Sequence, residues 1–108
     1  MIVEVRSYRI KPGHREEFIQ FFETRSTPAL RSHGMQILGP LLDLENPNKF
    51  VWLRSFPSLD ERDRMRNEFY EGALWKNELE AIAMPLIESY DVTLCETSLG
   101  YVFDGPRE

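Results

Sequence analysis

The sequence has little cysteine, little histidine and a shortage of positive charge, and each of these excludes a class of protein. The only cysteine among its 108 residues is Cys95, so no disulfide can form within the chain and a reducing compartment is expected. The 2 histidines are far apart and far from Cys95, so no metal-ligand spacing is present. With 13 basic and 18 acidic residues the net charge is −5, which argues against a nucleic-acid-binding protein and a polybasic membrane anchor.

Long hydrophobic runs are also missing, and the first ten residues do not predict a signal peptide. Glu4 interrupts the first apolar stretch, and no run approaches the roughly 18 residues that span a membrane. We therefore expect a cytoplasmic protein that does not associate with membranes. In the absence of repeats and linkers, residues 1–108 are predicted to form one domain with a C-terminal tail at 99–108.

The first half of the chain predicts a strand, a broken helix and an edge strand. Alternating residues predict a strand over residues 2–10, and clustered phenylalanines predict a helix over 13–26. Thr27-Pro28 is typical of an N-cap followed by a first-turn proline, so we expect a break there, and Gly34 should end the short helix that follows. Residues 35–44 predict an edge strand with a bulge, because Pro40 cannot donate to a central ladder.

The second half predicts a buried strand, two helical segments and a last strand. Residues 49–56 are apolar on both faces, and Ser58-x-x-Glu61 is a capping box that predicts a helix to about residue 70. A further helix is expected over residues 74–84 and a strand over 88–97. The helical wheel predicts that Leu59, Met65, Phe69, Ala73, Trp75, Leu79, Ile82 and Ala83 are buried, with Arg62 among them.

This order, β-α-β-β-α-β, predicts an α+β, ferredoxin-like sandwich with a four-stranded antiparallel sheet and helices on one face. The other face would be uncovered, although strand 49–56 is apolar on both sides. We therefore expect two copies to pair as a homodimer that forms a dimeric α/β barrel. In the alternative, Tyr101, Val102 and Phe103 of the tail cover that face in a monomer.

A family resemblance rests on four segments of the chain: VEVRSYRIKPGHREEFIQFFE, TPALRSHGMQILGP, SFPSLDERDRMRNEF and EGALW. Their sequences, order and spacing resemble those of the NIPSNAP family, which belongs to the dimeric α/β-barrel superfamily. The resemblance implies the same fold and the same pairing, but it implies no established common reaction. Related barrels include cofactor-free monooxygenases, isomerases and haem-degrading enzymes, whose site usually lies between sheet and helices. Since residues 58–84 contain no histidine that could ligate haem iron, we expect no cofactor and no metal.

Several arginines are candidates for a ligand pocket. Arg62 and Arg66 fall on the inner side of a helix, where a guanidinium could bind an anion through its bidentate fork or pair with Glu4. Tyr8, Arg6 and Arg54 lie on the predicted central strands, where they could be polar groups of a cleft or barrel, or the arginines could form an internal ion pair across the dimer.

The remaining candidates are one histidine and three aromatic residues. His33 could act as a general base or simply cap a helix end. Trp52, Tyr70 and Trp75 could line a pocket or belong to the core. Because no spaced acid–base pair is present, no catalytic residue is assigned.

Two functions are compatible with this pattern. The favoured one is a domain of uncharacterised activity that binds a small organic ligand or acts as a scaffold dimer. The alternative is a cofactor-independent monooxygenase-like or isomerase-like enzyme with its site between sheet and helices. A closed cleft there, with two or more polar groups converging on empty space, would favour the enzyme, and a cleft filled by Trp52, Phe69 and Trp75 would exclude it.

Overall fold

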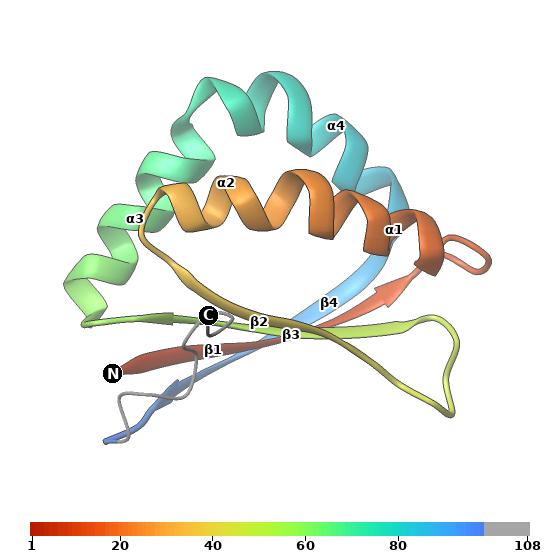
Figure 1. Cartoon of the computed structure of the whole chain (residues 1–108), viewed down its shortest axis with the longest axis horizontal. Helices are drawn as coiled ribbons and strands as arrows, with labels where there is room; N and C mark the ends of the chain where they lie inside the picture. Colours follow the sequence, from red (N-terminus) through yellow and green to blue (C-terminus); the bar gives the residue numbers. More distant parts are fainter. Residues whose placement is uncertain (99–108) are drawn as a thin grey trace, which may run out of the picture.

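A computed structural model describes residues 1–98 of the chain, which form four strands and a helical layer (Figure 1). The strands are β1 (Ile2–Ile10), β2 (Gln36–Leu42), β3 (Lys49–Phe56) and β4 (Ile87–Glu96). The helices are α1 (Arg15–Phe21), α2 (Thr27–Ser32), α3 (Leu59–Glu71) and α4 (Glu80–Ala83). Two π-helical turns, Phe22–Ser26 and Trp75–Leu79, and a 3-10 turn, Met84–Leu86, extend them. The predicted α+β order is confirmed; the predicted tail, residues 99–108, lies outside the described residues.

The four strands form one antiparallel sheet in the order β2-β3-β1-β4. The central strand β1 pairs with both neighbours, and Val5 lies opposite Leu53 on β3 and Thr93 on β4. Figure 1 shows all helices arching over the same face of this sheet. The ferredoxin-like arrangement and the edge position of β2 are therefore as predicted.

The predicted bulge in β2 lies where this strand passes over Trp52. The register between β2 and β3 shifts between Leu38 and Leu41. Gly39 has a φ of 137°, and a Cβ at this position would lie 2.8 Å from the Cβ of Trp52. Only glycine combines this backbone conformation with so close an approach.

The predicted break at Thr27-Pro28 is wrong, because a π-helical turn carries the helix through it. Thr27 has helical angles, φ −59° and ψ −48°, and its N–H donates to the carbonyl of Phe22 five residues earlier. This wider turn changes the hydrogen-bond pattern immediately before Pro28, so the proline's missing N–H does not end the helix. Gly34, with φ 94°, follows the C-terminal end of the helix as predicted.

The capping box at the start of α3 is half formed. The Ser58 hydroxyl accepts a hydrogen bond from the Glu61 N–H at 3.1 Å, which confirms the predicted start of the helix. The Glu61 carboxylate, however, pairs with Arg64 on the solvent side. Among the hydrogen bonds of the described residues, no return contact to Ser58 is present.

The predicted buried stripe is correct in its middle and wrong at three positions. Met65 and Phe69 are buried, whereas Leu59 lies exposed in the first turn of α3. Ala73 is exposed because the chain turns extended at Gly72, which separates it from the α3 wheel. Ile82 is 39% exposed, since the π-helical turn before α4 shifts the residues that follow it around the axis.

Among the described residues 1–98, all helices lie on one face of the sheet, and we call the opposite face the uncovered sheet face. It carries an apolar strip from three strands, which contains Val5, Leu38, Leu41, Val51 and Leu53. Leu38 and Leu41 are 39% and 46% exposed. Within residues 1–98, no helix has both the length and the apolar character that crossing a bilayer requires.

Candidate functional site

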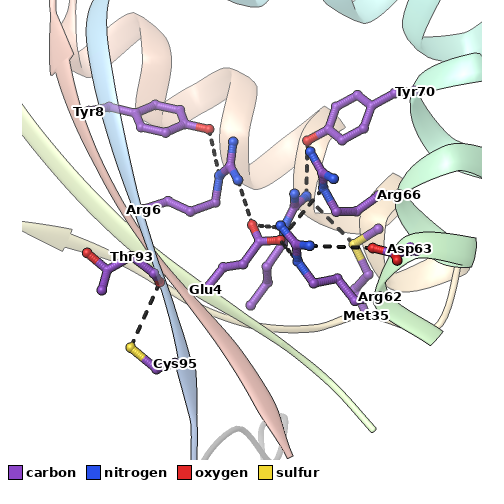
Figure 2. A network of polar contacts seen from close by, with 11 residues as sticks. Glu4, Arg6, Tyr8, Met35, Arg62, Asp63, Arg66, Tyr70, Thr93 and Cys95 are labelled. Atoms are coloured by element: carbon purple, nitrogen blue, oxygen red, sulfur yellow. Dashed lines mark hydrogen bonds and ion pairs between the residues drawn. The ribbon is translucent and has the colours of Figure 1, made fainter. Parts of the chain in front are cut away.

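One buried carboxylate, that of Glu4, receives arginines from three elements. Its Oε1 accepts from Arg6 Nη1 at 2.6 Å and from Arg54 Nε at 2.8 Å, and its Oε2 accepts from Arg62 Nε at 2.6 Å. Arg66 Nε lies 3.7 Å from Oε2. Figure 2 shows Arg6, Arg62 and Arg66 converging on Glu4 from the sheet and from α3. We call Glu4 and the four arginines the Glu4 cluster.

The strand and helix periods explain how the sequence builds the Glu4 cluster. Glu4 and Arg6 are two residues apart on β1, so both point to the helical side of the sheet. Arg54 lies directly opposite Glu4 on β3. Arg62 and Arg66 are one helical turn apart on α3 and face the sheet together.

The electrostatics of the Glu4 cluster keep Glu4 and Arg6 charged. Burial by itself would raise the pKa of Glu4, but attraction to Arg54 and Arg6 and the hydrogen bonds from Arg54 and Arg62 lower it to about 2. Burial would likewise lower the pKa of Arg6, but Tyr8, Tyr70 and Glu4 raise it above its ordinary value. One carboxylate thus faces four guanidinium groups, and the site carries an excess of positive charge.

Two of these arginines also orient tyrosines. Arg6 Nε donates to the hydroxyl oxygen of Tyr8, and Arg54 Nη1 donates to that of Tyr70, each at 3.0 Å. Burial raises the pKa of Tyr8 despite the attraction of Arg6. Tyr8 therefore stays protonated at neutral pH, and its hydroxyl hydrogen remains available to donate.

Beside the Glu4 cluster, between the sheet and the helices, lies an open cavity of about 330 Å³. Its polar lining comes from Arg6, Tyr8, Ser26, Arg66, Tyr70 and Glu80. Its apolar lining comes from Phe18, Phe21, Phe22, Leu30, Trp52, Phe69, Trp75, Ala83, Met84, Ile87 and Tyr90. A concave, mainly aromatic wall with a few converging polar groups is the usual form of a small-molecule site.

Two buried donors on the cavity wall have no hydrogen-bond partner among the described residues. They are Nε1 of Trp52, a residue only 3% exposed, and Nε of Arg66. The buried Arg54 Nη2 and Thr27 Oγ1 are also unpartnered there, but neither residue lines the cavity. Because buried polar groups are normally hydrogen-bonded, the two donors on the wall call for an acceptor.

The structure brings five of the eight predicted site residues to the cavity, which are Tyr8, Trp52, Arg66, Tyr70 and Trp75. Arg54 and Arg62 belong to the Glu4 cluster without lining the cavity, so both mainly serve as ion-pair partners of Glu4. His33 lies elsewhere, at the C-terminal end of α2, where Nδ1 is 3.0 Å from the carbonyl oxygen of Ala29.

The site is centred on Glu4, which the sequence indicated only as a possible ion-pair partner of Arg62 and Arg66. It also contains Arg6, which was predicted as a polar group on a central strand. Glu4 and Arg6 lie two residues apart on β1 and so point to the same face of the sheet. In the sequence, the indication of this site was a carboxylate within an otherwise apolar strand. The cavity wall also includes Phe18 and Glu80, whose place depends on how the helices pack. Among the described residues, no three His, Cys, Asp or Glu side chains are grouped closely enough to hold a metal ion.

The fold and the site define a ferredoxin-like α+β domain with an arginine-rich cavity between its sheet and its helices. Comparison with known families places it more narrowly: the NIPSNAP family model matches residues 3–96, and the chain belongs to this family.

Solved structures agree with that assignment. A NIPSNAP family protein of unknown function from Agrobacterium tumefaciens is 26% identical, with a TM-score of 0.79 over 88% of this chain and 86% of that one. A NIPSNAP domain protein from Burkholderia xenovorans, described as uncharacterised, is 19% identical, with a TM-score of 0.80 over 93% and 97%. An antibiotic biosynthesis monooxygenase shares the fold at 15% identity, with a TM-score of 0.66 over 90% and 98%. No match was found among curated proteins.

Proposed function

We propose that this NIPSNAP domain binds a small organic molecule in the cavity between its sheet and its helices. The observation that carries the proposal is the open space of about 330 Å³, walled by aromatic rings and by the unpartnered donors of Trp52 and Arg66. In a domain that only had to fold, aromatic side chains would close such a space to ordinary core density. The volume lies at the lower end of the roughly 300–1,000 Å³ of ligand pockets, which suits a small ligand.

The residues of the cavity favour binding over acid–base catalysis. Tyr8 is held as a donor, and the described wall contains no histidine. Its one carboxylate is that of Glu80, an exposed residue. The likeness to a monooxygenase concerns the fold alone, so turnover of a bound ligand would be a separate finding.

A matched pair of variants tests this proposal. Met84 lines the cavity and is 44% exposed, so Met84→Trp should narrow the cavity while the fold is kept. Ile82, two residues earlier and 39% exposed, does not line it, so Ile82→Trp is the control. Fragment screening by NMR with 2-naphthol, indole and 2-naphthoate should give shifts at cavity residues that Met84→Trp abolishes and Ile82→Trp keeps. Binding that survives Met84→Trp unchanged would place the ligand elsewhere and refute the proposal.

We also propose that two copies pair through the uncovered sheet face as a homodimer. The apolar strip of Val5, Leu38, Leu41, Val51 and Leu53 supports this, because exposed apolar surface of this kind is commonly buried by a partner. Two-fold pairing of identical faces is the simplest closed assembly. Light scattering at micromolar concentration should give twice the chain mass.

We further propose a reducing, cytoplasmic location for this domain. The support is compositional: the chain has 1 cysteine, Cys95, which is half-buried and cannot pair within the chain. Cell fractionation with a tagged full-length chain tests this, and recovery from an oxidising compartment would contradict it.

A further inference from the structure

The charge around the cavity is unbalanced at Arg66. Arg6, Arg54 and Arg62 each donate a hydrogen bond to Glu4 within 2.8 Å, whereas Arg66 reaches Glu4 only at 3.7 Å. Arg66 has no hydrogen-bond partner within residues 1–98, although its Nε is buried. Its side chain lines the cavity and is 35% exposed, so the charge is accessible from the open space.

Apart from the distant contact with Glu4, the described acids close to the cavity form no ion pair with Arg66. The carboxylate of Glu80 lines the cavity but forms no ion pair with any described arginine. Asp63 contacts Arg62 at 3.5 Å and is itself largely exposed. A cation held at the edge of a low-dielectric wall is stabilised by an anion that accepts its hydrogen bonds.

The neutral polar groups of the cavity present donors as well. The Trp52 N–H is buried and unpartnered in the described part of the chain. The oxygens of Tyr8 and Tyr70 already accept from Arg6 and Arg54, so each hydroxyl has its hydrogen left to give. An arginine bonded to the oxygen polarises the O–H bond and makes it a better donor. The complementary ligand group carries acceptor oxygens and a negative charge.

The aromatic side chains of the cavity wall determine which ligand scaffold fits. Phe22 and Trp52 lie edge to face at 5.1 Å, as do Tyr70 and Trp75, and both pairs line the cavity. Aromatic walls bind flat, apolar groups by offset stacking and edge contacts.

From these observations we infer that the cavity recognises a flat aromatic carboxylate. Arg66 forms the charged hydrogen bonds to the carboxylate, and Tyr8, Tyr70 and Trp52 are its neutral donors. The inference rests on the small-molecule site proposed above and names the chemical class of its ligand. Glu4 takes no part in contacting the ligand: it holds Arg6 and Arg54, which in turn fix the two tyrosines.

A pair of nearly isosteric probes tests the charge requirement. Isothermal titration calorimetry with 2-naphthoate and with neutral 2-naphthamide compares the same ring system with and without a negative charge. We expect the unmodified protein to bind 2-naphthoate at least tenfold more tightly. Arg66→Gln should remove this preference by weakening 2-naphthoate binding, while 2-naphthamide binding stays within twofold. Arg66→Lys should give an intermediate affinity, because it keeps the charge without the fork.

Arg64→Gln is the matched control. It removes the same charge from the same helix, but Arg64 pairs with Glu61 and Glu68 on the exposed side. It should leave both affinities unchanged, and circular dichroism verifies that each variant is folded.

The outcomes separate the inference from the proposed function. Equal affinity for both probes, or tighter binding of 2-naphthamide, overturns the carboxylate inference and leaves the small-molecule site intact. An equal loss with Arg64→Gln and Arg66→Gln also overturns it, since the effect would then be one of overall charge. If neither probe binds, the carboxylate inference is overturned, and the fragment screen with 2-naphthol and indole decides separately whether the cavity binds a small molecule.

Discussion

Glu4 and Arg62 are 58 positions apart in the chain, and their side chains meet at 2.6 Å between Oε2 and Nε. This contact joins the central strand β1 to α3 across the buried layer of the domain. Arg54 completes the link from β3, at 2.8 Å from Oε1. Within the described residues, the ion pairs between the sheet and α3 therefore pass through one carboxylate, which makes Glu4 the structural centre of the site.

Removing the charge of Glu4 should destabilise the fold strongly. In Glu4→Gln, three arginines lose their anionic partner in a buried setting, which costs about 3–5 kcal/mol in the free energy of unfolding. Glu61→Gln is the control, because it breaks an exposed ion pair with Arg64 and should cost less than about 1 kcal/mol. Urea denaturation measures both values. Similar small losses in the two variants would show that the Glu4 cluster adds little stability.

The stability contributed by Glu4 should depend on pH in a defined window. Its pKa is lowered from 4.5 to about 2 in the folded chain, so the unfolded chain takes up a proton first as the pH falls. The contribution is complete above about pH 5 and is lost progressively toward pH 2. Denaturation between pH 6 and pH 2.5 should show a steeper loss in the unmodified protein than in Glu4→Gln. Parallel pH profiles would contradict the lowered pKa.

Gly39→Ala should lower both the stability of the fold and the ligand affinity of the cavity. The new Cβ would lie 2.8 Å from the Trp52 Cβ at a φ of 137°, so the backbone or Trp52 has to move. We expect a loss of about 2–3 kcal/mol and weaker ligand binding. Gly13→Ala is the control, with a φ of 82° but no atom within 4 Å of its Cβ. It should cost about 1 kcal/mol and leave binding unchanged; an equal effect of both variants would remove the steric argument.

Pairing through the uncovered sheet face should be sensitive to a single charge. Leu53 lies at the centre of the apolar strip, so Leu53→Lys should convert a dimer to a monomer. Ile82→Lys places the same charge on an exposed position of the helical layer and should leave the mass unchanged. Sedimentation velocity distinguishes the two. A monomer in the unmodified protein would refute pairing from the outset.

Local patterns predicted the fold well and the site partly. The strand period placed β3 at its observed bounds, and the helical wheel turned Arg62 inward. The same wheel failed at Ile82, since a π-helical turn leaves no signal in a pattern read at 3.6 residues per turn. The cavity depends on packing between helices and sheet that no local pattern specifies, so Trp52 and Trp75 could not be assigned to core or pocket from the sequence. The sequence left open whether Arg62 binds an anionic ligand or pairs with Glu4, and the structure shows the ion pair with Glu4.

A crystal structure with 2-naphthoate would show directly whether the cavity binds an aromatic carboxylate. We expect the naphthyl ring between the helices and the sheet, against Phe22 and Trp75, with a carboxylate oxygen within hydrogen-bond distance of Arg66. A cavity that stays empty at saturating 2-naphthoate, or a probe bound only on the uncovered sheet face, would contradict this expectation.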